Sequence, residues 1–419
     1  MAIDCTRPAA IAESGAPVLR GPADIASLPN YLEQVVLADR HEIGRRAQKD
    51  GWLKTHSIEH LEAALALAPP SADTARSKNR GRIVFLPTNG NGLGHARRCA
   101  LIASAIKGPS PRVFAAFPSC VPLIAAQGFS CLPLVQRSED HDKGYANDLL
   151  NYLRLRRTLH TGDRLVFDGG FVFESIFRAI VEKSLDSVWV RRGLWQPGQI
   201  NEMALEREKV FDRVVVPQEA FDELNSPYSF GKHIHQVGPI VDQSKLAPEK
   251  RRTLRHDLQK HLNLEFDELI VTMLGGGVAT DRSAQLQTMC SIADRRPRCL
   301  QIVVVWPNSK VSPSVYAWGN TRVVKTRNAL SLCQAADLVV SAAGYNSFHE
   351  ILYHAIPSIL IPQVAAYMDD QEKRARAASD RGLSETVMAD ELMRLEREVS
   401  SFLDHGKADK IRKNLAGAS

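Results

Sequence analysis

The sequence is poor in the features that mark several specialised classes of protein. It has 419 residues, only 6% of them aromatic, and its seven cysteines are irregularly spaced with no C-x-x-C pair. Such cysteine usage argues against a disulfide framework or a structural zinc site and favours a reducing compartment. No apolar run is long enough to span a bilayer, and the start lacks the basic and apolar segments of a signal peptide. We therefore expect a cytoplasmic protein.

Charge and size narrow the choice of partners. The chain carries 53 Lys and Arg against 47 Asp and Glu, a net charge of +6, and 44% of its residues are hydrophobic. This composition is globular, and the length predicts two domains. Because basic and acidic residues are interspersed, we expect no nucleic-acid partner. The small positive excess is compatible with an anionic substrate or peripheral contact with the inner face of a membrane.

The first 80 residues differ in composition from the rest. Prolines punctuate the start, and helical patterns follow over Tyr31–Gln48 and Ser57–Ala68, the second opening on a serine suited to cap a helix. A polar stretch with prolines and serines then leads to Arg82. We predict a helical extension and linker over residues 1–80, and no motif gives it a chemical role.

Strand-like and helix-like runs alternate from Arg82 onward, which is typical of parallel βαβ units with helices on both faces of a sheet. The alternation pauses in a polar, proline-containing segment, His235–Lys250, and then restarts. We predict an α/β protein with Rossmann-like domains over residues 81–240 and 241–419, its final helical segment crossing back toward the first domain. Ligands bind beyond the carboxyl ends of such strands, so we expect the site in a cleft between the facing domains.

The stretch Ser341–Gln363 is the most informative. After an apolar strand, small residues and Gly344 allow a tight turn, and a helix opens over Tyr345–Ser347. The unpaired amides of a helix start suit a diphosphate. Glu350 lies on the same helical face as Ser347, where it can accept hydrogen bonds from ribose hydroxyls. The alternative is an ordinary strand-to-helix turn with a solvated glutamate.

A second glycine-rich segment, Asn89–Arg98, follows the first strand of the alternating region. It lacks the G-K-[ST] ending of a P-loop, and no acidic residue at the end of the next strand supports a dinucleotide fingerprint. His95 can take a proton from an attacking hydroxyl or water near neutral pH. Asp168, at the end of a later strand, would assist His95 or bind the acceptor. Structural roles remain open for both: His95 packed within its helix, and Asp168 as a turn residue.

The segment around Gly344 resembles the donor site of GT-B glycosyltransferases, in particular the family of the peptidoglycan N-acetylglucosaminyltransferase. Shared features are a strand, a small-residue turn with glycine and serine, a helix with glutamate at the position of Glu350, and then an acidic residue and glutamine, here Asp370 and Gln371. The resemblance covers residues 270–380. The pair Tyr345–Asn346 departs from the small or aliphatic residues usual in the family.

This resemblance implies the GT-B fold and transfer of a sugar from a UDP-sugar to a hydroxyl of a glycan or lipid-linked acceptor, in cell-envelope or exopolysaccharide synthesis. It implies no cofactor besides the UDP-sugar substrate. The backbone around Thr326 would read the base, and Asp370 and Gln371 would contact the sugar. The expected site residues are the catalytic His95 and Asp168, the donor residues Gly275, Gly276, Thr326, Gly344, Tyr345, Asn346, Ser347, Glu350, Asp370 and Gln371, and the acceptor or phosphate loop residues Asn91, Gly92, Gly94, Arg97 and Arg98.

Two alternatives stay open. The loop Gly92–Ala100 also resembles that of the UDP-sugar hydrolase of the pseudaminic acid pathway, which has the same fold and a loop histidine that activates water, so hydrolysis or epimerisation is the first. A non-catalytic nucleotide-sugar-binding subunit of a membrane glycosyltransferase is the second. The triplet Asp140–Asp142 matches the D-x-D of metal-dependent transferases of the other major fold, but the chain lacks that fold's layout, and we expect no required metal.

Overall fold

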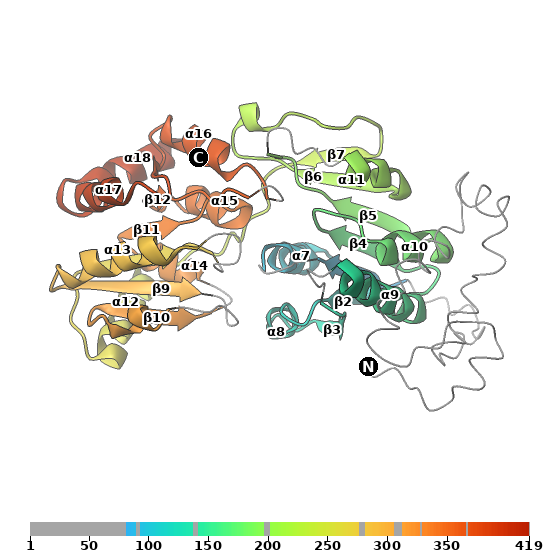
Figure 1. Cartoon of the computed structure of the whole chain (residues 1–419), viewed down its shortest axis with the longest axis horizontal. Helices are drawn as coiled ribbons and strands as arrows, with labels where there is room; N and C mark the ends of the chain where they lie inside the picture. Colours follow the sequence, from blue (N-terminus) through green and yellow to red (C-terminus); the bar gives the residue numbers. More distant parts are fainter. Residues whose placement is uncertain are drawn as a thin grey trace.

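A computed structural model of the chain describes residues 81–88, 93–136, 141–196, 202–275, 281–305, 312–326, 329–365 and 368–418. The helical extension predicted over residues 1–80 lies outside them. The described residues form two parallel sheets, each covered by helices and lying next to one another (Figure 1).

The first sheet has seven parallel strands in the order β3-β2-β1-β4-β5-β6-β7. Its central strand β1 is apolar and buried throughout, and β4 is buried at every residue after Arg164, as expected for strands covered on both faces. The strands are β1 (Ile83–Pro87), β2 (Arg112–Ala116), β3 (Ser130–Pro133), β4 (Arg164–Asp168), β5 (Asp186–Val190), β6 (Arg213–Pro217) and β7 (Ile234–Val237). The helices are α7 (Gly94–Ala105), α8 (Val121–Ala126), α9 (His141–Thr158), α10 (Glu174–Lys183) and α11 (Glu202–Arg207).

The second sheet has six parallel strands in the order β10-β9-β8-β11-β12-β13. The strands are β8 (Glu268–Met273), β9 (Cys299–Val305), β10 (Thr321–Lys325), β11 (Leu338–Ser341), β12 (Ser358–Leu360) and β13 (Glu385–Thr386). The helices are α12 (Pro248–Leu262), α13 (Ser283–Asp294), α14 (Leu330–Ala335), α15 (Tyr345–Tyr353), α16 (Gln371–Ser379), α17 (Leu392–Asp404) and α18 (Lys407–Ala418).

Both sheets share the strand order of a doubly wound Rossmann fold, so each has one point where the order reverses. In the first sheet this point lies between β1 and β4, and in the second between β8 and β11. The segments singled out in the sequence lie at or just beyond the carboxyl ends of these four strands: the glycine-rich loop before His95, then Asp168, then Gly275, then the turn at Gly344. The topology therefore gathers them at two switch points, where ligands bind in such sheets.

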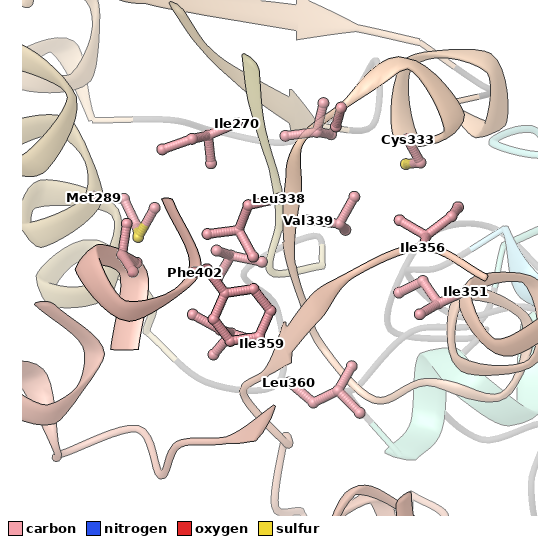
Figure 2. Close-up of a cluster of buried hydrophobic side chains, with 14 of the residues drawn as sticks. Ile270, Met289, Cys333, Leu338, Val339, Ile351, Ile356, Ile359, Leu360 and Phe402 are labelled. Carbon is pink, nitrogen blue, oxygen red and sulfur yellow. The ribbon is translucent and has the colours of Figure 1, made fainter. Parts of the chain in front are cut away.

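The final helices belong to the second domain. Leu395, Val399 and Phe402 of α17 are buried in the same core as the strands of the second sheet. Figure 2 shows Phe402 among Leu338, Ile359 and neighbouring apolar side chains. The prediction that a final helical segment crosses back to the first domain is wrong, because the apolar face of α17 is buried against its own sheet.

The segment predicted as a domain boundary, His235–Lys250, contributes a strand before it connects the domains. Residues 234–237 form β7, which pairs with β6 at the edge of the first sheet. The strand was missed because three of its four residues are exposed and the apolar alternation is weak. No helix among the described residues is long and apolar enough to cross a bilayer.

Candidate functional site

The two switch points meet where α7 of the first domain contacts α15 of the second (Figure 1). The Asn346 Nδ2 group, in the first turn of α15, donates a hydrogen bond of 2.9 Å to the carbonyl of Gly94, in the first turn of α7. His95 follows Gly94 directly. The predicted diphosphate-binding helix start and the predicted catalytic histidine are therefore brought together across the domain interface.

Asp168 lies fully buried beneath this contact and binds two side chains of α7. Its Oδ1 is 2.6 Å from His95 Nδ1 and 2.6 Å from Arg98 Nη2, and its Oδ2 accepts a hydrogen bond of 2.8 Å from Arg98 Nε. A carboxylate at Nδ1 orients the imidazole and leaves Nε2 to act on a proton. Of the three roles considered for Asp168, the geometry matches assistance of His95.

Asp168 and Arg98 stabilise each other's charged form. Burial raises the pKa of Asp168, but Arg98 and His95 outweigh it and hold that pKa below its usual value. Burial lowers the pKa of Arg98, but Asp168 reverses the effect and raises it above the ordinary value. Arg98, expected in the acceptor or phosphate loop, has its guanidinium buried against Asp168.

Arg97 points instead at the second domain. Its Nη2 lies 2.9 Å from Glu350 Oε1 and 3.4 Å from Asp242 Oδ2. Burial raises the pKa of Glu350; Arg97 opposes this shift, and Asp242 adds to it. Glu350, predicted to bind ribose, thus lies at the domain interface with an arginine from the other domain as its partner.

The helix α15 begins as the sequence predicted, with Gly344 as its N-cap in extended backbone. The two residues that depart from the family pattern both reach the first domain. The Tyr345 hydroxyl donates to the carbonyl of Gln218 at 3.0 Å and accepts from the amide of Ile240 at 3.3 Å. Asn346 makes the contact with Gly94 described above. These two side chains fasten α15 to the first domain, and the expectation that the backbone amides of this helix start bind the donor diphosphate stays a prediction.

The other predicted donor residues lie along the carboxyl edge of the second sheet. Asp370 caps α16, its Oδ1 accepting the amide of Lys373 at 3.0 Å, and its expected contact with the sugar stays a prediction. The Gln371 Oε1 atom accepts the amide of Gln363, and its Nε2 lies 3.9 Å from where a Cβ on Gly344 would stand. Gln371 therefore borders the turn before α15, as expected.

Three further predicted donor residues are Gly275, Thr326 and Ser347. Gly275 adopts a positive φ of 83°, and a Cβ there would lie 2.5 Å from Gln363 Nε2, so the turn requires glycine. The amide of Thr326 donates to the carbonyl of Val305 at 3.3 Å, and the expectation that the backbone around it reads the base stays a prediction. Ser347 is half-buried in the first turn of α15. Asn91, Gly92 and Gly276 lie outside the described residues.

Comparison with known proteins supports this fold. Residues 303–417 match the family model of the glycosyltransferase family 28 C-terminal domain. A UDP-N-acetylglucosamine--N-acetylmuramyl-(pentapeptide) pyrophosphoryl-undecaprenol N-acetylglucosamine transferase of Moorella thermoacetica is 25% identical over 184 residues, covering 40% of this chain and 48% of that protein. The chain thus matches about half the length of this curated relative.

Solved structures extend the fold comparison to most of the chain. MurG of Acinetobacter baumannii superposes with a TM-score of 0.50 at 10% identity, covering 80% of this chain and 94% of that one. A putative UDP-N-acetylglucosamine 2-epimerase from Listeria monocytogenes gives 0.52 at 11% identity, covering 79% and 91%. The chain has the GT-B fold and resembles the peptidoglycan N-acetylglucosaminyltransferases.

Sequence reasoning missed a buried ionic cluster that joins the two domains of this GT-B chain. Arg374 of α16 makes a two-pronged contact of 2.7 and 2.6 Å with Glu219, which follows β6, and its Nη1 lies 2.5 Å from Asp369. His349 of α15 accepts the amide of Ala220 at its Nε2. Glu219 and Arg374 are 155 residues apart, and no local pattern marks either as a partner.

Two residues of the D-x-D triplet, His141 and Asp142, lie at the start of α9, and Asp140 lies outside the described residues. Among the residues that the structure describes, no group of three or more His, Cys, Asp or Glu side chains is placed to hold a metal ion.

Proposed function

We propose that the protein is a glycosyltransferase that moves a sugar from a UDP-sugar to a hydroxyl acceptor. The observation that carries the proposal is the His95–Asp168 pair of the first domain, held beside the start of α15 in the second. One domain thereby offers a base, and the other offers the amides of a helix start suited to a diphosphate. The match to the family 28 C-terminal domain supports the same assignment for the second domain.

In the proposed reaction, His95 Nε2 removes the proton from the acceptor hydroxyl. The oxygen of that hydroxyl bonds to the anomeric carbon of the sugar. The bond between that carbon and the diphosphate oxygen breaks, and the electron pair leaves with UDP. Buried, ionised Asp168 stabilises the imidazolium that forms, since Oδ1 lies 2.6 Å from Nδ1. The helix start at α15 stabilises the charge that develops on the departing diphosphate. The proposal assigns no role to a metal.

Glu350 is the proposed ribose ligand. It lies in the second turn of α15, close to the amides that would hold the diphosphate. Because its carboxylate contacts Arg97 at 2.9 Å, ribose binding requires it to share or exchange that partner. Donor binding is thereby coupled to the contact between the two domains.

The named relative acts on a lipid-linked acceptor, undecaprenol pyrophosphate carrying a muramyl pentapeptide. By analogy we propose a glycan or lipid-linked acceptor of the cell envelope, reached from the inner face of the membrane. The same histidine–aspartate pair can also activate water. Hydrolysis or epimerisation of the UDP-sugar is the second candidate, which the fold shared with a putative epimerase favours.

The first test is a thermal-shift screen of UDP-sugars with the full chain. The bound donor should raise the melting temperature by mass action. Glu350→Ala should erase the shift, whereas Glu249→Ala, which removes an exposed acid of the same domain, should keep it. A shift that survives Glu350→Ala with unchanged affinity contradicts the ribose assignment.

The second test separates transfer from its rivals by measuring UDP release with and without an acceptor extract. His95→Ala should lower the rate about 100-fold or more, because general-base catalysis contributes that much, and should leave UDP affinity within about twofold. UDP release at the full rate without acceptor would establish hydrolysis instead. Full pathway activity in His95→Ala, with activity lost in Glu350→Ala, would establish a non-catalytic binding subunit.

A further inference from the structure

Arg282 is a buried arginine with no carboxylate partner among the described residues. Only 4% of its surface is exposed. Its Nε and Nη1 atoms are inaccessible to water and have no hydrogen-bond partner there, and its Nη2 donates only a long bond of 3.3 Å to the carbonyl of Pro362. Its neighbour Asp281 does not compensate the charge, since Oδ1 accepts the amide and hydroxyl of Ser283.

This isolation is exceptional among the buried arginines described above. Arg98 and Arg374 are buried to a similar degree, and each makes two bonds with a buried carboxylate. For Arg282, burial alone lowers the pKa, with no acidic group raising it. A guanidinium stays charged at any physiological pH, and a buried, uncompensated charge is a cost to the stability of the folded protein. Such a cost is retained where a ligand supplies the missing charge.

The position of Arg282 indicates which anion would supply the missing charge. It is the N-cap of α13, the helix that follows β8 and Gly275. Pro362, which it contacts, precedes Gln363, and the side chain of Gln363 donates to the carbonyl of Leu274 at the end of β8. Gln363 also binds Gln371, which borders the turn at Gly344. Arg282 therefore lies at the same edge of the second sheet as the proposed donor site.

We propose that Arg282 is a positioning residue for the donor, its guanidinium neutralising the diphosphate from the side of β8 while the start of α15 binds it from the side of β11. This assignment rests on the proposed function for the nucleotide, but the phosphate chemistry is tested independently with inorganic pyrophosphate. The anion supplies the counter-charge that the folded protein lacks. Arg282 stabilises the bound diphosphate at the expense of the free protein's stability.

The test uses Arg282→Met in the full chain, with Arg295→Met as the matched control. Arg295 lies at the other end of α13, exposed and paired with Glu396. Pyrophosphate and UDP should bind Arg282→Met about tenfold or more weakly than the wild type, the usual loss for a charged hydrogen bond. Uridine, which has no phosphate, should bind both proteins alike. The unliganded Arg282→Met protein should melt at the same or a higher temperature, because an uncompensated charge has gone.

The outcomes separate this proposal from the proposed function. Weaker pyrophosphate binding with an undiminished melting temperature supports the role of Arg282, whether or not UDP is the natural nucleotide. Unchanged binding of pyrophosphate and UDP in Arg282→Met overturns it and leaves the proposed function standing. A lower melting temperature without a change in affinity makes Arg282 structural and also overturns it. A wild type that binds pyrophosphate but not UDP overturns the proposed function alone.

Discussion

At the scale of single residues, Asp168 shows how one buried carboxylate serves two purposes. It orients the His95 imidazole and compensates the charge of Arg98. Both of these partners belong to α7. Its position at the end of a central strand keeps it away from water, which strengthens both interactions. Removing the charge should therefore damage stability and activity together.

Asp168→Asn should lower the free energy of unfolding by about 3 kcal/mol, because Arg98 then remains as an unpaired buried charge. It should also lower the transfer rate about 100-fold or more, because the imidazolium loses its stabilising anion. Urea unfolding and initial-rate assays measure the two effects. Asp168→Asn with Arg98→Met should recover most of the stability and none of the rate; recovery of both would show that Asp168 is only structural.

At the scale of elements, α15 carries contacts on both of its turns. Its first residues reach the first domain through Tyr345 and Asn346, and its second turn presents His349 to the segment after β6. The His349 Nδ1 group donates to the carbonyl of Tyr345 at 2.7 Å, and Nε2 accepts the amide of Ala220. This pattern requires the neutral imidazole.

Burial lowers the pKa of His349 to about 4, outweighing the nearby Glu219. Below pH 6.5 the unfolded chain binds a proton that the folded chain refuses until about pH 4, so stability falls as pH falls through this window. The loss attributable to His349 should reach about 3 kcal/mol. Chemical unfolding of the wild type between pH 7 and pH 4 measures it.

His349→Gln provides the control for this pH dependence. Glutamine keeps a side-chain acceptor for Ala220 and does not titrate, so the slope of stability against pH should flatten between pH 6.5 and pH 4. The variant should be less stable than the wild type at pH 7, since its fit to both backbone partners is poorer. A slope equal to that of the wild type would show that His349 does not titrate in this range.

At the scale of the whole molecule, the two domains are joined by side chains on which the proposed chemistry also depends. Arg97 reaches from α7 to Glu350, and Asn346 reaches from α15 to Gly94. Under the proposed assignment of Glu350, ribose binding competes with the Arg97 contact. The interface and the proposed donor site then share one carboxylate.

Arg97→Met should bind uridine about fivefold more tightly at pH 8, because Glu350 no longer gives up an ion pair worth about 1 kcal/mol. Isothermal titration measures the affinity. Arg213→Met, which removes an exposed arginine from the first domain, should bind uridine like the wild type. Weaker uridine binding in Arg97→Met would show that Arg97 helps Glu350 to hold the ribose rather than competing for it.

The sequence alone determined the two doubly wound domains and the segments that lie at their switch points, because strand and helix periodicity and glycine turns are local properties. Because these signals are local, the sequence also placed His95, Asp168, Gly275 and Gly344 at the carboxyl edges of the two sheets. Only the tertiary structure decided the partners. Arg98 pairs with Asp168, and Arg97 pairs with Glu350 of the other domain. Tyr345 and Asn346 form hydrogen bonds with the first domain. These partners are distant in sequence, so only the folded chain brings them together. For the same reason the sequence could not single out Arg282. What distinguishes this arginine is that its buried Nε and Nη1 atoms have no hydrogen-bond partner among the described residues.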